Sequence, residues 1–208
     1  VGSEMCIRDS RLTEAYGGGS MTALPIIETL AGDVAAYIPT NVISITDGQI
    51  YLENDLFFAG QRPAVNVGLS VSRVGGSAQT KAVKKTAGTL RIDLARFREL
   101  EVFTQFSSDL DPATKEQLEY GSGLMELLKQ PLYHPMSLHE KVITLCAATH
   151  KIFLGIDKKE IRQFRLDLMT WFDTKYPNIG EEIEEKKVLS DELIDQIVLI
   201  AEEFKKSR

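Results

Sequence analysis

The stretch "NVGLSVSRVGGSAQTKAVKK", residues 66–85, contains the change of pattern that decides the fold. Up to Val74, apolar residues alternate with polar ones, as they do in a strand with one buried face. Residues 75–85 then lose apolar character, and after about Thr80 apolar residues recur every three to four positions, which is typical of helices. We therefore predict a boundary between a strand-containing part and a helical part near residues 76–85.

Arg73 breaks the alternation that precedes it. Side chains two apart lie on one face of a strand, and Arg73 is in line with Val65, Val67, Leu69 and Val71. A guanidinium on a buried face needs an acidic partner or an anion. Three alternatives stay open here: an internal ion pair, a strand that has reached solvent, or an arginine that projects from a strand end towards phosphate oxygens, which suit its planar fork of donors.

Short apolar runs broken by Gly, Pro, Asp and Asn predict strands from Gly17 to about Thr80. The predicted strands are "TALPIIET" (22–29), "TNVISIT" (40–46), "QIYLE" (49–53) and "AVNVGLSVSRV" (64–74). The first two are apolar at nearly every position, as strands covered on both faces are in α/β sheets. We expect residues 11–80 to form a partial α/β layer.

The rest of the chain carries helix signals. Asp111 before Pro112 predicts a helix start, "SLHE" (137–140) is a capping box, and Ser190 is a third candidate cap. Apolar stripes at helical spacing contain Leu90, Leu94, Phe97, Leu100 and Phe103; Val142, Cys146 and Phe153; Ile161, Phe164, Leu168 and Trp171; and Leu193, Ile197, Ile200 and Phe204. Residues 81–208 should therefore form a helical bundle.

Composition excludes several classes of protein. The chain has 208 residues, of which 43% are hydrophobic and 26% charged, values that are typical of globular domains. A net charge of −6 without a basic stripe argues against nucleic-acid binding. Two cysteines are too few for a disulfide framework and favour a reduced compartment. The longest apolar run, residues 197–201, is too short to span a bilayer, so membrane association would be indirect.

Two glycine-rich segments invite a phosphate-loop interpretation and do not support it. The pattern G-x-x-x-x-G-K-[ST] occurs at neither "GGGS" (17–20) nor "GGSAQTK" (75–81). The sequence also shows no defensible catalytic triad and no metal-ligand spacing, so we predict no metal site. Residues 1–10, "VGSEMCIRDS", resemble a translated sequencing linker and are expected to be a non-native leader.

Longer strings identify a resemblance. "GGGSMTALPIIETLAGDVAAYIPTNVISITDGQIYLENDLF" (17–57) and "RPAVNVGLSVSRVGGSAQTKAVKKTAGTLRIDLARFRELEVFTQFSSDLD" (62–111) closely resemble the alpha subunit family of the F-type ATP synthase. The resemblance implies a truncated alpha subunit: the C-terminal part of a P-loop NTPase (RecA-like) nucleotide-binding domain at 11–80, followed by the C-terminal helical domain at 81–208. The phosphate loop, the magnesium ligands and an N-terminal barrel would lie upstream.

The resemblance assigns roles to individual residues. In "SVSRVG" it implies that Arg73 is an arginine finger that reaches the phosphates of a neighbouring beta subunit's nucleotide, and that Ser70 is required for activity. Ser44 of "NVISITDG" would face the same phosphates, and Ile43 and Val71 would line that interface. Arginine fingers supply roughly 10³ to 10⁵ in rate.

A second set belongs to the alpha subunit's own, non-catalytic nucleotide. Arg62 and Pro63 of "QRPAVNVG" and Gln130 of "LLKQPLYHPM" match residues around its adenine, whereas Leu132 replaces a second glutamine. The implied cofactors are ATP or ADP with Mg²⁺.

The implied function is a regulatory subunit of the proton-transporting rotary ATP synthase. The implied partners are beta subunits in an alternating ring, the gamma shaft and the peripheral stalk, and the acidic connection "SSDLDP" (107–112) would face the shaft. The location would be the cytoplasmic face of a bacterial plasma membrane, or the matrix or stromal face of an organelle membrane. The alternatives are a free nucleotide hydrolase, which lacks a phosphate cradle here, and a non-enzymatic helical interaction module.

Overall fold

The computed structural model describes the backbone of residues 2–6, 8–104 and 110–208. The chain divides into two compact units, Val1–Ala78 and Gln79–Arg208, called unit 1 and unit 2 below. The strands and turns lie in unit 1, and the long helices lie in unit 2. The acidic connection 107–112 lies in part outside the described residues, so its proposed contact with a shaft is not tested.

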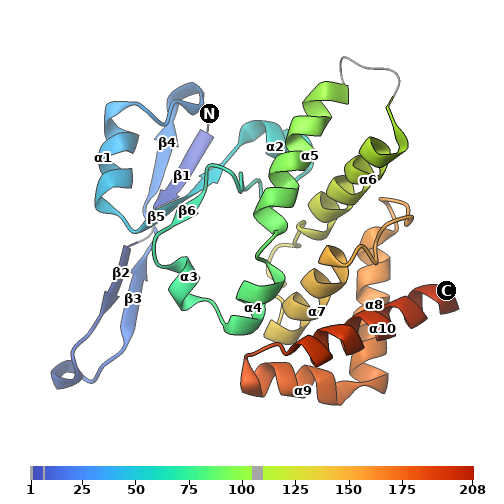
Figure 1. Ribbon diagram of the computed structural model, residues 1–208. Coiled ribbons are helices and arrows are strands. Elements are labelled where there is room, and N and C mark those ends of the chain that lie inside the picture. Colours follow the sequence, from blue (N-terminus) through green and yellow to red (C-terminus); the bar gives the residue numbers. More distant parts are fainter. Residues whose placement is uncertain (1, 7, 105–109) are drawn as a thin grey trace. The chain divides into compact units, whose positions relative to one another are not determined.

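Unit 1 contains two sheets and a few short helices (Figure 1). Its elements are β1 (Gly2–Cys6), β2 (Arg8–Arg11), η1 (Glu14–Tyr16), β3 (Ser20–Ala23), β4 (Ile26–Thr29), η2 (Leu30–Gly32), α1 (Tyr37–Ile45), β5 (Gly48–Leu52), α2 (Asn54–Phe58), β6 (Val71–Ser72) and α3 (Gly75–Ala78). The larger sheet has the order β4-β1-β5-β6, and β2 and β3 form a separate ribbon. Every described strand pair is antiparallel. The sheet in this chain therefore differs from the parallel arrangement typical of α/β domains.

Strand β1 lies between β4 and β5, with Glu4 opposite both Ile27 and Tyr51. Residues 2–6 thus take part in the backbone pairing of the larger sheet, and residues 8–10 in that of the β2–β3 ribbon. Pairing does not reveal the origin of these residues, and the non-native leader stays a prediction.

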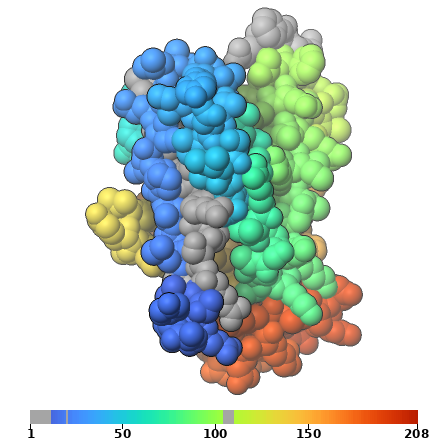
Figure 2. All heavy atoms as spheres, turned by 90° about the vertical axis from the view of Figure 1, so that its left-hand side faces the viewer, coloured from blue at the N-terminus to red at the C-terminus, as the bar shows by residue number. Residues whose placement is uncertain are grey.

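The predicted strand 40–46 is wrong, because these residues lie in helix α1. Pro39 occupies the first turn, where a missing N–H is tolerated. Polar side chains bond back to the turn before them: Asn41 Nδ2 donates to the Tyr37 carbonyl, and Thr46 Oγ1 donates to the Val42 carbonyl. Tertiary context, which includes the burial of Pro39, overrides the β propensity of the Val and Ile residues. The outer surface of α1 faces the viewer in Figure 2.

The other strand predictions hold only in part. The run 49–53 corresponds to β5, and the end of 22–29 corresponds to β4. Coverage on both faces is wrong for β4, since Ile26 is 70% exposed. Within 64–74 only Val71 and Ser72 form a strand, preceded by an isolated bridge between Val65 and Leu52. Most of residues 64–74 is therefore turn or irregular backbone rather than strand.

Unit 2 is a helical bundle, as expected from the apolar stripes. Its helices are α4 (Lys81–Thr86), α5 (Leu90–Thr104), α6 (Pro112–Leu127), α7 (Leu138–Thr149), α8 (Ile161–Lys175), α9 (Pro177–Lys186) and α10 (Asp191–Ser207). The fully buried side chains Val142, Ile143 and Cys146 place α7 inside this bundle. The rings of Phe164 and Phe204 meet edge to face at 5.2 Å and join α8 to α10.

The caps in unit 2 form as the sequence predicts. Asp111 accepts from the Thr114 N–H, Ser190 accepts from the Leu193 N–H, and Ser137 forms both hydrogen bonds of a capping box with Glu140. Each satisfies donors that the helix itself leaves unpaired. One stripe residue departs from the prediction, because Phe103 at the end of α5 is 69% exposed.

Candidate functional site

Arg73 directly follows β6 in unit 1. Its backbone N–H donates to the Asp47 carbonyl at 2.8 Å, and its Nη2 donates to the Ile43 carbonyl at 3.5 Å. The side chain is exposed. The alternating pattern, which placed Arg73 on the buried face of a strand, is therefore wrong at this position. The reason is the turn before it, which ends the alternation on which that prediction rested. In the part of the chain that the structure describes, Arg73 forms no ion pair with a carboxylate. Its guanidinium can therefore bind an external anion.

Ser70 closes the turn against β5. Its Oγ accepts from the Tyr51 N–H at 3.0 Å and donates to the Asn66 carbonyl at 2.6 Å. The hydroxyl takes the place that a strand carbonyl would have beside β5. Both of its hydrogen bonds lie inside unit 1, so Ser70 is suited to hold backbone rather than to react.

Ile43 and Ser44 lie in the last turn of α1. The Ile43 carbonyl accepts from Arg73, so the structure brings these two predicted site residues together. Ser44 is exposed and its Oγ donates to the Asn41 carbonyl at 2.6 Å. Val71 in β6 is 42% exposed. The last turn of α1 and the end of β6 together present an arginine, a hydroxyl and apolar side chains.

Arg62 and Pro63 lie on the loop after α2. The Arg62 guanidinium stacks over the Phe57 ring at 4.4 Å from its centre, and both Arg62 and Pro63 are exposed. The stacked guanidinium offers a flat cationic surface. The neighbouring Gln61 is 6% exposed and fixes the loop from inside.

Gln130 lies in unit 2, after α6. It is exposed, and its Nε2 donates to the His134 carbonyl at 2.9 Å. With Leu90, Leu127, Met136 and others it lines a mostly apolar hollow of about 180 Å³. Because the two units are described separately, the structure does not test whether Gln130 and Arg62 share one adenine site.

Leu132, the departure from the family pattern, lies on the same loop as Gln130. Its side chain is 77% exposed, and the next residue, Tyr133, is 89% exposed with a φ of 62°. An exposed leucine here cannot replace the amide contact of a glutamine. The loop presents apolar surface where the family pattern has a hydrogen-bonding group.

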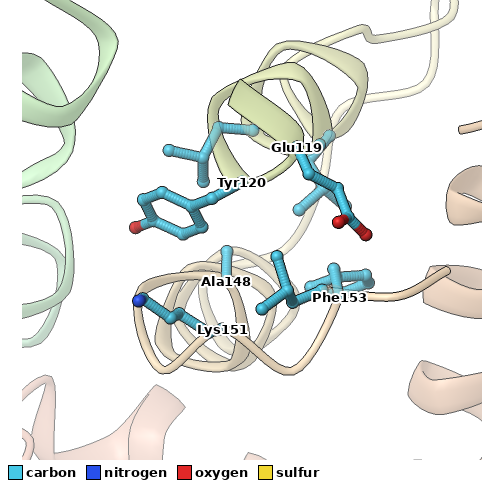
Figure 3. Close-up of a pocket in the computed structure, with 9 residues that line it drawn as sticks. Glu119, Tyr120, Ala148, Lys151 and Phe153 are labelled. Atoms are coloured by element: carbon cyan, nitrogen blue, oxygen red, sulfur yellow. The ribbon is translucent and has the colours of Figure 1, made fainter. Parts of the chain in front are cut away.

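Other hollows in unit 2 offer less chemistry. Figure 3 shows one between α6 and the turn after α7, where Tyr120 and Lys151 lie on one side and the Glu119 carboxylate points away from them. Its volume of about 10 Å³ has room for about one water molecule. A shallow hollow of about 260 Å³ beside Trp171 and Lys175 lies on the surface of α8. Charged side chains line both, Glu119 and Lys151 in the first and Asp167 and Lys175 in the second.

Two titratable groups in unit 2 are held in their neutral forms. Burial and the nearby Asp93 carboxylate raise the pKa of Tyr120 to about 12. Burial raises the pKa of Cys146 to about 11. At neutral pH neither group is the anion that a nucleophile would need to be.

Within residues 2–6, 8–104 and 110–208, no three His, Cys, Asp or Glu side chains gather in a way that could hold a metal ion. No helix in those ranges has the length and apolar content needed to cross a membrane.

Asn66 is the site residue that sequence reasoning missed. It is buried and makes hydrogen bonds on both sides of the turn that leads to Arg73. The signal was present as "NVG", an asparagine two residues before a glycine, which is typical of an Asx turn.

Comparison with known proteins identifies both units. Residues 79–204 match the model of the ATP synthase alpha/beta chain, C terminal domain, and residues 3–72 match the ATP synthase alpha/beta family, nucleotide-binding domain. The chain is 57% identical over 204 residues to ATP synthase subunit alpha of Clostridium kluyveri, and 55% identical over 203 residues to that of Clostridium botulinum. Each match covers 98% of this chain and 40% of the relative, so the chain spans about two fifths of the length of these relatives. The chain belongs to the ATP synthase alpha/beta family and is similar to subunit alpha.

Proposed function

We propose that this chain works within an alpha subunit of the rotary, proton-transporting ATP synthase, where it supplies Arg73 to a nucleotide bound by a neighbouring beta subunit. The observation that carries the proposal is the exposed guanidinium at the end of β6, without a carboxylate partner among the described residues. An unpaired arginine at a surface is suited to phosphate oxygens. Family membership supplies the context in which such a phosphate would be found.

The surroundings of Arg73 favour a contact between subunits. Val71 in β6 is 42% exposed and Ile45 in α1 is 69% exposed, so the two elements next to Arg73 present apolar side chains at the surface. Exposed Ser44 adds a hydroxyl. A partner that covers these apolar groups would also exclude water from the arginine and strengthen its attraction to phosphate. Interfaces commonly combine apolar area with arginine in this way.

Magnesium ATP, when bound by the partner, would supply the phosphates and their charge neutralisation. In this chain the donor groups of Arg73 and the Ser44 hydroxyl would stabilise phosphate charge from one side, while Ile43 would line the interface. Arg62, Pro63 and Gln130 are proposed to contact the adenine of a second, non-catalytic nucleotide, as part of a RecA-like domain. The stacked guanidinium of Arg62 supports that role, because it offers a flat surface to a base.

Assembly would bring the chain to a membrane without crossing it. We place it in the alternating ring of alpha and beta subunits, in contact with the gamma shaft and the peripheral stalk, on the cytoplasmic face of a bacterial membrane or the corresponding face in an organelle. The exposed apolar side chains of unit 1, which include Tyr37, Ile38 and Phe58, are consistent with extensive contacts to other chains.

The test uses a chimeric alpha subunit in which this chain replaces the matching part of the Clostridium kluyveri subunit. Complexes assembled with Arg73→Ala should lose on the order of 10³-fold or more in ATP turnover, with an unchanged yield of assembled complex, because the side chain is exposed. Arg162→Ala, which removes an exposed arginine on α8, is the matched control and should retain turnover. Unchanged turnover with Arg73→Ala would instead favour a helical interaction module.

A further inference from the structure

The direction of Arg73 depends on the segment before it. Residues 66–70 form a turn, and only Val71 and Ser72 are strand. Among the described residues, the Arg73 side chain makes one hydrogen bond, at 3.5 Å to the Ile43 carbonyl. Such a long bond holds a side chain weakly. The reach of the guanidinium is therefore set mainly by where the backbone of this segment is fixed.

Asn66 fixes the start of the segment. Its side chain is 4% exposed, and its Oδ1 accepts from the N–H groups of Gly68 at 2.9 Å and Leu69 at 3.0 Å. Its Nδ2 donates to Glu53 Oε1 at 2.9 Å. The amide thus shapes the turn with its oxygen and ties that turn to the end of β5 with its nitrogen. An alanine at this position could do neither.

The backbone of Asn66 completes the attachment to β5. Its N–H donates to the Tyr51 carbonyl at 2.9 Å. Its carbonyl accepts from the Ser70 N–H at 3.0 Å and from Ser70 Oγ at 2.6 Å, and Ser70 Oγ accepts from the Tyr51 N–H. The turn is therefore hydrogen-bonded to both the backbone N–H and the backbone carbonyl of Tyr51. The position of Ser70 therefore depends on the position of Asn66, to whose carbonyl it is hydrogen-bonded.

Gly48 fixes the other end. It pairs with Ser72, and a Cβ at Gly48 would lie 2.2 Å from the Val71 carbonyl oxygen and 2.9 Å from Ser72 Cα. Its φ of +150° is also one that side chains disfavour. Only glycine allows β5 and β6 to approach this closely. Beside it, Arg73 N–H donates to the Asp47 carbonyl.

We propose that Asn66 is a positioning residue for Arg73: by closing the 66–70 turn onto β5, it sets where the guanidinium can reach, while Gly48 permits the close approach that fixes the far end. This inference rests on the proposed function of Arg73. Neither residue contacts phosphate in this scheme, and both act through the backbone. A displacement of about 1 Å in a catalytic group can lower a rate on the order of 10²-fold.

The experiment measures kcat and KM for ATP hydrolysis by complexes that carry the chimeric subunit. Asn66→Ala should lower kcat on the order of 10²-fold, with KM nearly unchanged, because the displaced group acts on the transition state rather than on binding. Asn54→Ala, an exposed asparagine on α2 in the same unit, is the matched control and should leave kcat unchanged.

A double-mutant cycle separates positioning from general instability. In an Arg73→Ala background, measured by single turnover, Asn66→Ala should cause no further loss, because the group it positions is already absent. A merely structural role would lower the rate by the same factor in both backgrounds, and that result overturns the proposal.

A conservative exchange provides rescue. Asn66→Asp keeps the acceptor for Gly68 and Leu69 but places two carboxylates together at Glu53, and it should lower kcat. Adding Glu53→Gln restores a hydrogen bond of reversed polarity, and kcat should recover. If complexes with Asn66→Ala do not assemble, the variants Asn66→Asp and Asn66→Asp with Glu53→Gln decide. An unchanged kcat with Asn66→Asp alone, or no recovery of kcat in the double variant, contradicts the proposal.

The two proposals fail in different ways. Loss of turnover with Arg73→Ala and normal turnover with Asn66→Ala would leave the function standing and remove the positioning role. Normal turnover with Arg73→Ala would remove the function itself and the inference with it.

Discussion

The two units differ most in how much of their own apolar surface they bury. Unit 2 buries large side chains on nearly every helix, among them Phe164, Leu168, Ile183 and Ile197. Among the described side chains of unit 1, the buried hydrophobic ones are Tyr51 and Ala64. Unit 1 instead exposes the large apolar residues Leu12, Tyr16, Met21, Leu24, Ile26, Leu30, Tyr37, Ile38, Ile45, Phe57, Phe58, Leu69, Val71 and Val74.

This difference indicates two kinds of stability. Burial of a Leu, Ile or Phe side chain contributes about 1.5–3 kcal/mol, so unit 2 has its own core. Among its described side chains unit 1 buries few large apolar groups, and it would be stabilised by surfaces that cover it. Arg73, Ser70 and Ser44 lie in unit 1, the unit whose stability would depend on contacts with other surfaces. A residue that acts on a neighbour's nucleotide is well placed in such a surface, because the same contact covers the apolar groups and presents the arginine.

Separation of the units tests this comparison and has the largest expected effect. Expressed alone, residues 79–208 should unfold cooperatively on heating, while residues 1–78 should associate or aggregate because their apolar side chains are uncovered. Sedimentation gives the state of association, and calorimetry gives the cooperativity. A monodisperse 1–78 with a sharp transition would show that the apolar surface of unit 1 does not control its stability.

A smaller effect is expected from a close helix contact in unit 2. A Cβ at Gly121 on α6 would lie 2.3 Å from Phe97 Cδ2 and 2.4 Å from Phe97 Cβ, and Phe97 is 8% exposed. Because the clash is with the root of a buried side chain, α5 and α6 must separate. Gly121→Ala should lower the free energy of unfolding by about 1–3 kcal/mol, as measured by urea denaturation.

Gly123→Ala is the matched control on the same helix. Its Cβ would meet Ile161 Cδ1 at 3.5 Å, an ordinary contact. Alanine also favours a helix over glycine by about 1 kcal/mol, so this variant should be neutral or more stable. Equal losses at both positions would show that the α5–α6 crossing is not the constraint.

The smallest effect concerns pH. Hydrogen bonds from the backbone N–H of His139 at 3.0 Å and from its ring at 2.9 Å lower the pKa of Glu184 from its usual 4.5. A lowered carboxyl pKa contributes stability that is present above about pH 4.5 and is lost as the pH falls through the folded value. Glu184 is 44% exposed, so the contribution should stay within the roughly 0–1 kcal/mol of exposed pairs.

Unfolding by urea between pH 3 and 7 gives the measurement. Glu184→Gln should reduce the acid-induced loss of stability, whereas Glu181→Gln, a neighbouring exposed carboxyl, should not. Identical pH profiles for wild type and Glu184→Gln would contradict the assignment.

The helical unit could be predicted because its signals are local. The caps at Asp111, Ser137 and Ser190 each satisfy N–H groups within three residues of themselves. Stripes such as Ile161, Phe164 and Leu168 repeat within one helix, and all three residues are buried. The information that makes these helices lies inside each helix. Helix α9, which begins at Pro177, was not anticipated, because no apolar stripe or polar cap was recognised there.

The strand-containing unit could be predicted only in part because its signals depend on distant partners. The run 40–46 has β propensity and forms the end of α1, and the alternation in 64–74 becomes a turn closed by Asn66. Strand pairing requires a partner whose identity a single run does not encode. Arg73, Ser70 and Ser44 were singled out because they belong to strings that resemble the family, and their roles stay predictions.

By itself the sequence determined a change from strands to helices near residues 76–85, the capped helices of unit 2 and the family. Only the tertiary structure decided that Arg73 is exposed, that Ser70 bonds to the backbone of β5, and that Asn66 and Gly48 fix the segment between them. The physical reason is the separation along the chain between the residues that interact. Caps and helical stripes are satisfied by residues three or four apart, whereas the direction of one side chain at the end of a strand is set by hydrogen bonds to residues far along the chain.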